Sequence, residues 1–87
     1  MIKISIDDIN VGTRVILSGS GINFTLSDSE TITIDIEGLT GTVLEKRGKK
    51  LFVHYKIQMD ENARDVHHKL KNVSLEWNVC ELMVGKL

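Results

Sequence analysis

The chain has 87 residues, of which 41% are hydrophobic and 26% are charged, and its formal net charge is −1. This length suits a single domain over residues 1–87 with one small core, and the composition is that of an ordinary globular protein. No apolar run approaches the roughly 20 residues of a membrane-spanning helix, and the alternating N-terminal sequence lacks the apolar block of a secretory signal. Cys80 is the single cysteine. Because it cannot form an internal disulfide, we expect a cytoplasmic protein.

The small net charge hides an uneven distribution along the chain. Residues 1–45 carry two basic and seven acidic side chains, whereas residues 46–87 carry nine basic and five acidic ones. Such a division predicts an electrically two-sided surface that steers partners rather than decides the fold.

Alternation of apolar and polar residues with a period of two is the dominant pattern. It is typical of strands that bury one face. Isoleucine, valine and threonine, which favour strands, are frequent in these runs. The alternating segments are residues 2–6, 22–26, 32–36, 51–57 and 73–79.

Turn residues separate these runs in the first half of the chain. Gly12 opens a further strand that is expected to end near Leu17, and a Ser-Gly-Ser-Gly turn follows at 18–21. The polar residues 27–30 lie between the runs 22–26 and 32–36. Their spacing predicts that these two runs pair as a hairpin.

Residues 38–57 read as a second hairpin with a basic turn. Gly48 suits a turn position with positive φ. The tip holds four basic residues within five positions, namely Lys46, Arg47, Lys49 and Lys50. Residues 58–71 then form a long polar segment, which we expect to be a loop with one helical turn around Glu61–Val66. Long loops in compact domains are often functional.

Short strands at this spacing predict an all-β fold, and 87 residues favour a small barrel over a two-sheet sandwich. The order of elements resembles an SH3-like barrel. Residues 11–15 would be its first core strand, residues 18–37 an elongated first loop that is itself a hairpin, and residues 75–79 with Leu82 its closing segment. Gly38–Leu44 followed by 51–53 looks like the glycine-then-hairpin element of KOW-type members. That resemblance implies contact with nucleic acid or with the machinery that handles it.

The candidate binding residues are basic or aromatic side chains of the tip and of the long loop. The tip residues could contact phosphates or an acidic protein face, and an outward Phe52 beside lysines could stack on a base or cover a neighbouring loop. Loop residues extend this patch if the loop folds beside the tip. The set is Lys46, Arg47, Lys49, Lys50, Phe52, His54, Arg64, His67, Lys69 and Lys71.

Other chemistry has little support in the sequence. Cys80 with His54, His67 and His68 matches no zinc spacing, and nothing marks an orienting group or an oxyanion site for a cysteine nucleophile. No glycine-rich phosphate loop is present. We therefore expect no metal, no cofactor and no catalytic residue, and Trp77 and Tyr55 are expected in the core.

These observations predict a non-enzymatic binding module, most simply a small regulatory protein that recognises another protein. The alternative is a nucleic-acid-binding accessory domain that uses the basic tip. The two remain open at this point because a basic tip suits an acidic protein as well as a phosphate backbone. No membrane contact is expected, and self-association through an edge strand is a further option.

Overall fold

The computed structural model describes residues 9–26, 28–49 and 52–87. Each alternating run within this part contains a strand, but those in the runs 51–57 and 73–79 begin only at His54 and Glu76. The expected strand at residues 2–6 lies outside this part. The predicted all-β class is confirmed, since strands and short 3₁₀ helices make up the regular structure. The strands are β1 (Arg14–Leu17), β2 (Ile22–Thr25), β3 (Thr31–Ile34), β4 (Thr40–Arg47), β5 (His54–Met59), β6 (Glu76–Cys80) and β7 (Val84–Lys86).

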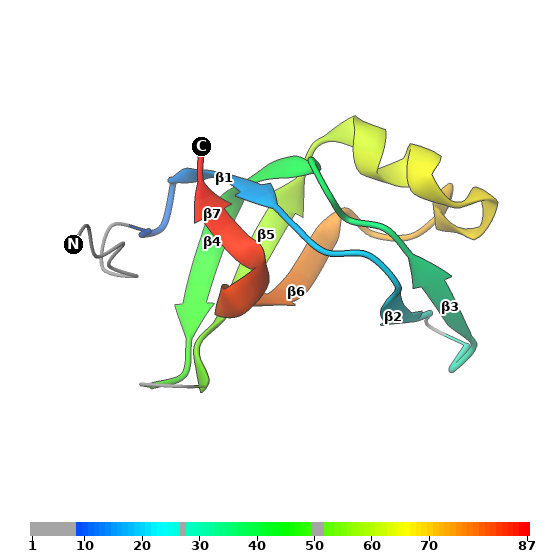
Figure 1. Cartoon of the computed structure of the whole chain (residues 1–87), viewed down its shortest axis with the longest axis horizontal. Coiled ribbons are helices and arrows are strands. Elements are labelled where there is room, and N and C mark those ends of the chain that lie inside the picture. The colour runs from blue at the N-terminus through cyan, green and yellow to red at the C-terminus, as the bar shows by residue number, and fades with distance from the viewer. Residues whose placement is uncertain (1–8, 27, 50–51) are drawn as a thin grey trace.

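Five strands form one antiparallel sheet in the order β6-β5-β4-β1-β7, and β2 pairs with β3 in a separate hairpin (Figure 1). The prediction that the strands close into a barrel is wrong for the described residues, because β6 and β7 are the two outer edges of an open sheet. The 3₁₀ helix η5 (Glu81–Met83) carries the chain from β6 to β7. β7 has only three residues and pairs with β1 at the opposite end of the sheet.

The predicted hairpin in the first long loop is confirmed. β2 and β3 pair antiparallel from Ile22 opposite Ile34 to Thr25 opposite Thr31. Ile32 and Ile34 are buried while the threonines of β3 face solvent, as the alternation requires. This hairpin projects beyond the five-stranded sheet at the right of Figure 1.

The basic hairpin is also confirmed, as β4 and β5 pair antiparallel. A register shift between Val43 and Glu45 marks a bulge that leaves Leu44 exposed. At the turn Gly48 has a φ of 94°, and a Cβ there would lie 1.9 Å from the carbonyl oxygen of Phe52. A side chain cannot fit at this position, so the turn needs glycine.

The segment 58–71 is more ordered than the predicted loop. Its first two residues belong to β5, and two 3₁₀ helices follow, η3 (Glu61–Val66) and η4 (His68–Leu70). The helical turn expected at Glu61–Val66 is therefore confirmed. Ala63 and Leu70 are buried and anchor the two helices through their apolar contacts.

An ion pair fastens the start of η3 to the sheet. Asp60 accepts two hydrogen bonds from the Arg14 guanidinium, at 2.9 and 2.7 Å, and one from the Thr40 hydroxyl. These bonds, first that of Arg14 and then that of Thr40, lower the pKa of Asp60 to about 2. The contact joins β1, β4 and η3 at the end of the sheet far from the basic turn (Figure 1).

The core lies between the inner face of the five-stranded sheet, the β2–β3 hairpin and the 3₁₀ segment. Tyr55 is completely buried in it and Trp77 nearly so, as predicted. No polar or charged residue is classed as buried among the described residues apart from that tyrosine and tryptophan. The other large buried side chains are Leu17, Ile57, Met59, Leu70, Val15 and Val43.

Close strand packing predicts that Gly41 tolerates no side chain. A Cβ at Gly41 would lie 2.6 Å from both the carbonyl oxygen of Gln58 and a methyl group of Ile57. We expect Gly41→Ala to lower the free energy of unfolding by about 1–3 kcal/mol, the usual cost of overpacking. Urea denaturation measures this change.

Gly85→Ala is the matched control, because a Cβ there meets nothing closer than 3.8 Å. It should change the free energy of unfolding by less than about 0.5 kcal/mol. Equal denaturation midpoints for the wild type and Gly41→Ala would contradict this account of the β4–β5 contact.

Candidate functional site

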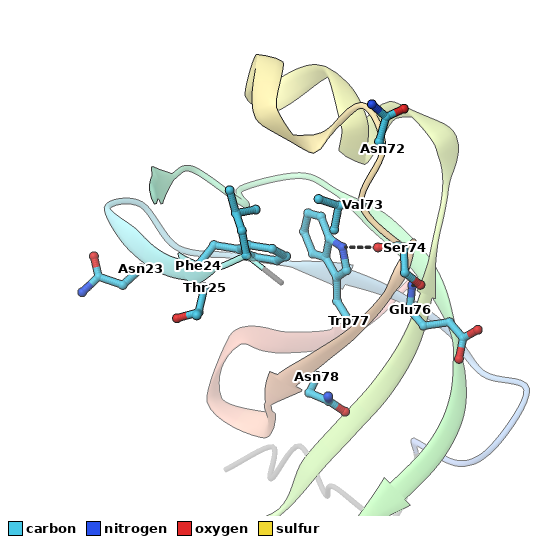
Figure 2. Close-up of a pocket in the computed structure, with 10 residues that line it drawn as sticks. Asn23, Phe24, Thr25, Asn72, Val73, Ser74, Glu76, Trp77 and Asn78 are labelled. Atoms are coloured by element: carbon cyan, nitrogen blue, oxygen red, sulfur yellow. Dashed lines mark hydrogen bonds between the residues drawn. The ribbon is translucent and has the colours of Figure 1, made fainter. Parts of the chain in front are cut away.

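An aromatic pair joins β6 to the β2–β3 hairpin. Trp77 of β6 is 5% exposed and points to the inner face, where its ring centroid lies 5.0 Å from that of Phe24 on β2. The two rings are tilted by 60°, a favourable geometry for aromatic side chains. The indole N–H donates a hydrogen bond of 3.1 Å to the carbonyl oxygen of Ser74. Figure 2 shows this bond and the two rings facing each other.

An ion pair holds the same hairpin at a second point. Lys69 of η4 contacts the carboxylate of Glu30, which lies just before β3. The two residues are 39 positions apart in the chain. The hairpin is therefore attached to β6 by an apolar contact and to η4 by a charged one, and the space between these elements becomes a groove.

The groove runs between β2 and the segment that leads into β6. Its first part has a volume of about 450 Å³ and is lined by residues 23–26 of the hairpin and by residues 72–74 and 76–78 (Figure 2). Neutral polar side chains at its rim include Asn23, Thr25 and Ser74. The Phe24–Trp77 pair forms its apolar floor.

Two further hollows continue the groove toward the basic turn. The second, about 220 Å³, is mainly apolar and is lined by Trp77, Val79 and Met83 among others. The third, about 330 Å³, lies between Arg47, Gly48, Phe52, His54 and Asn78. Asn78 lines all three hollows, so each of them borders β6. We call the three hollows together the β6 groove.

The structure places the tip residues at one end of the β6 groove. Phe52 is 77% exposed, and His54 lines both the second and the third hollow. Lys46, Arg47 and Lys49 lie at the same turn, whereas Lys50 lies outside the described residues. The outward positions predicted for Phe52 and His54 are confirmed.

The long loop does not fold beside the tip, so the condition for its residues to extend this patch is not met. β5 starts at His54 beside the turn and ends at Met59, and η3 begins only after it. The loop residues therefore lie at the opposite end of β5 from the tip (Figure 1). They are Arg64, His67, Lys69 and Lys71.

Several of the predicted basic residues are paired with carboxylates. Arg47 donates two hydrogen bonds to Glu45, at 2.8 and 3.0 Å, which raise the pKa of Arg47 and lower that of Glu45. Arg64 bonds to Glu61 at 2.9 Å, and Lys69 contacts Glu30. The positive charge available to a ligand is thus smaller than the sequence count indicates.

The four side chains considered as metal ligands do not converge. His54 and Cys80 are cross-strand neighbours on β5 and β6, but His67 and His68 stack on each other at 4.5 Å in the 3₁₀ segment. Within residues 9–26, 28–49 and 52–87 no three histidine, cysteine or carboxylate side chains form a metal-binding group.

Sequence reasoning missed the groove itself. It placed Trp77 in the core, which is correct, without recognising that the same ring forms the floor of a hollow. The aromatic Phe24 within the run 22–26 of the inserted hairpin was a usable signal. Asn23 and Asn78 occupy outward positions of alternating runs, so their exposure was predictable although their proximity was not.

Comparisons with protein-family models, with curated proteins and with solved structures found no match. The assignment to the SH3-like and KOW-type families therefore stays a prediction from the sequence. In the described part of the chain, no helix has the length and apolar character that crossing a membrane requires.

The aromatic floor predicts different roles for the two phenylalanines. Phe24→Ala should lower the free energy of unfolding by about 2 kcal/mol, since Phe24 is half-buried against Trp77 and loses packing. It should also shift the fluorescence of Trp77, the single tryptophan, to longer wavelength. Denaturation followed by this fluorescence measures both effects.

Phe52→Ala provides the control, because this ring is largely solvent-exposed. We expect neither the stability nor the emission maximum to change appreciably. An unchanged emission maximum in Phe24→Ala would contradict the contact between the two rings.

Proposed function

We propose that the protein is a non-enzymatic binding module that recognises a segment of a protein partner in the β6 groove. The observation that carries the proposal is that three hollows border one strand, with the Phe24–Trp77 pair in the first and the exposed Phe52 in the third. Binding grooves for protein segments are typically apolar with a few polar groups that fix orientation. A small regulatory protein of the cytoplasm is the role that fits this chemistry.

The charge distribution favours a protein ligand over a nucleic acid. The basic side chains are divided between two ends of the molecule, and Arg47, Arg64 and Lys69 are engaged with carboxylates. The first hollow is lined mainly by apolar side chains, amides and hydroxyls, and its one charged side chain is the acidic Glu76. A phosphate backbone would need a longer run of cationic groups.

Selection from a library of displayed random peptides, followed by amide chemical-shift mapping of the best binder, tests this proposal. We expect selected peptides to bind with micromolar affinity and to shift the signals of Phe24, Trp77 and Asn78. Phe24→Ala should weaken the selected peptide because it removes part of the floor.

Two outcomes would contradict the proposal. One is a selection that yields no peptide whose shifts fall in the β6 groove. The other is binding of fluorescent single-stranded RNA or DNA with a steep salt dependence that decreases when Lys46, Arg47, Lys49 and Lys50 are changed to alanine. The second result would favour the nucleic-acid alternative.

A further inference from the structure

One edge of β6 has backbone groups that the sheet does not use. The N–H of Met59 donates to the carbonyl oxygen of Leu75 at 2.7 Å, and the N–H of Glu81 donates to that of Val53 at 3.0 Å. In an antiparallel ladder, alternate residues direct their backbone groups to the same neighbour. Trp77 and Val79 therefore bond to β5, which pairs with β6 throughout.

The intervening residues Glu76, Asn78 and Cys80 direct their backbone groups away from β5. The N–H of Glu76 is satisfied by the Ser74 hydroxyl at 3.1 Å. β6 has no second neighbouring strand among the described residues, so the N–H and C=O of Asn78 face the groove without a strand partner. Asn78 is also the residue that lines all three hollows.

This edge lacks the features that usually block edge pairing. Proteins protect an edge with proline, lysine or a very short strand. β7, the other edge, has three residues and ends at Lys86, whereas β6 has five residues and the chain contains no proline. Of the three side chains on the outward side of β6, only Glu76 is charged, and it is paired with Lys56 at 3.2 Å.

We propose that the β6 edge receives an extended segment of the partner protein as an added strand, an inference that rests on the proposed function. Backbone hydrogen bonds to Asn78 would align the segment. A bulky apolar side chain of the segment would enter the second hollow, beside Trp77 and Val79. Alternate side chains of a strand point to opposite faces, so the neighbouring side chains of the segment remain in solvent.

Charge identifies one end of the segment. At the turn, Arg47 is paired with Glu45, and Lys46 and Lys49 add two further positive charges. Arg47 and His54 line the hollow at this end. An acidic residue at the end of the segment that lies beside the turn would complement this charge. The second hollow is mainly apolar and has no lysine, arginine, aspartate or glutamate in its lining, which suits uncharged residues at the centre of the segment.

Asn78→Pro tests the inference directly. Proline removes the N–H of residue 78, which points away from β5, so no ladder bond is lost and the edge position tolerates it. The probes are two capped eight-residue peptides in which threonine alternates with valine or leucine. The first probe carries two aspartates at its N-terminal end, and the second carries them at its C-terminal end. Binding is measured by calorimetry and amide chemical shifts, and the fold of each variant by its amide spectrum.

We expect one of the two probes to bind the wild type. The end at which that probe carries its aspartates then gives the direction of the added strand. Asn78→Pro should weaken it about tenfold more than Asn78→Ala does, which corresponds to the loss of one backbone hydrogen bond. In the peptide, N-methylation of the central amide that faces β6 should weaken binding about tenfold or more, whereas N-methylation of the adjacent amide, which faces away, should have a much smaller effect.

Three results would overturn the inference. In the first, the probe binds Asn78→Pro and Asn78→Ala with equal affinity while its chemical shifts still fall in the β6 groove. This result would exclude strand addition and leave the proposed function intact. If neither probe binds at millimolar concentration while library peptides still bind in the β6 groove, strand addition is likewise excluded and the proposed function stands. If the wild type sediments as a dimer and Asn78→Pro sediments as a monomer, the edge of β6 binds a second copy of the chain instead.

Discussion

The contact between Phe24 and Trp77 is the interaction that shapes the β6 groove. It fixes the β2–β3 hairpin against β6, and the groove exists because the two elements meet through side chains rather than through backbone pairing. If β2 paired with β6, the hollows would be filled and the edge of β6 would be used. Trp77 thus belongs to the core and to the groove at once.

The 3₁₀ segment at one end of the sheet is positioned by ion pairs, whereas the basic turn at the other end depends on a glycine. Asp60 ties η3 to β1 and β4 through Arg14 and Thr40, and Lys69 then reaches from η4 to Glu30 beside the hairpin. These partly exposed ion pairs contribute little stability individually, but they determine where the polar segment lies. That segment leads directly to Asn72 and Ser74 at the start of the groove. The basic turn, by contrast, is shaped by backbone requirements at Gly48.

Local pattern was sufficient to predict both hairpins and the positions of β1 to β6, because alternation and turn residues act over a few positions. It also identified Tyr55 and Trp77 as buried and the helical turn at Glu61–Val66. It missed the short β7. Alternation could even have predicted the Arg47–Glu45 pair, since residues two apart lie on one face of a strand. The contact between Lys69 and Glu30 could not be predicted, because it depends on how distant segments meet. The open sheet and the groove were missed for the same reason.

Backbone hydrogen exchange of the uncomplexed protein tests the central claim most directly. If β6 is an unpaired edge held beside the groove, the amides of Trp77 and Val79 should exchange slowly and that of Asn78 should exchange much faster, although all three lie in one strand. Protection of Asn78 equal to that of its two neighbours would show that another strand already occupies this edge, and it would contradict the account.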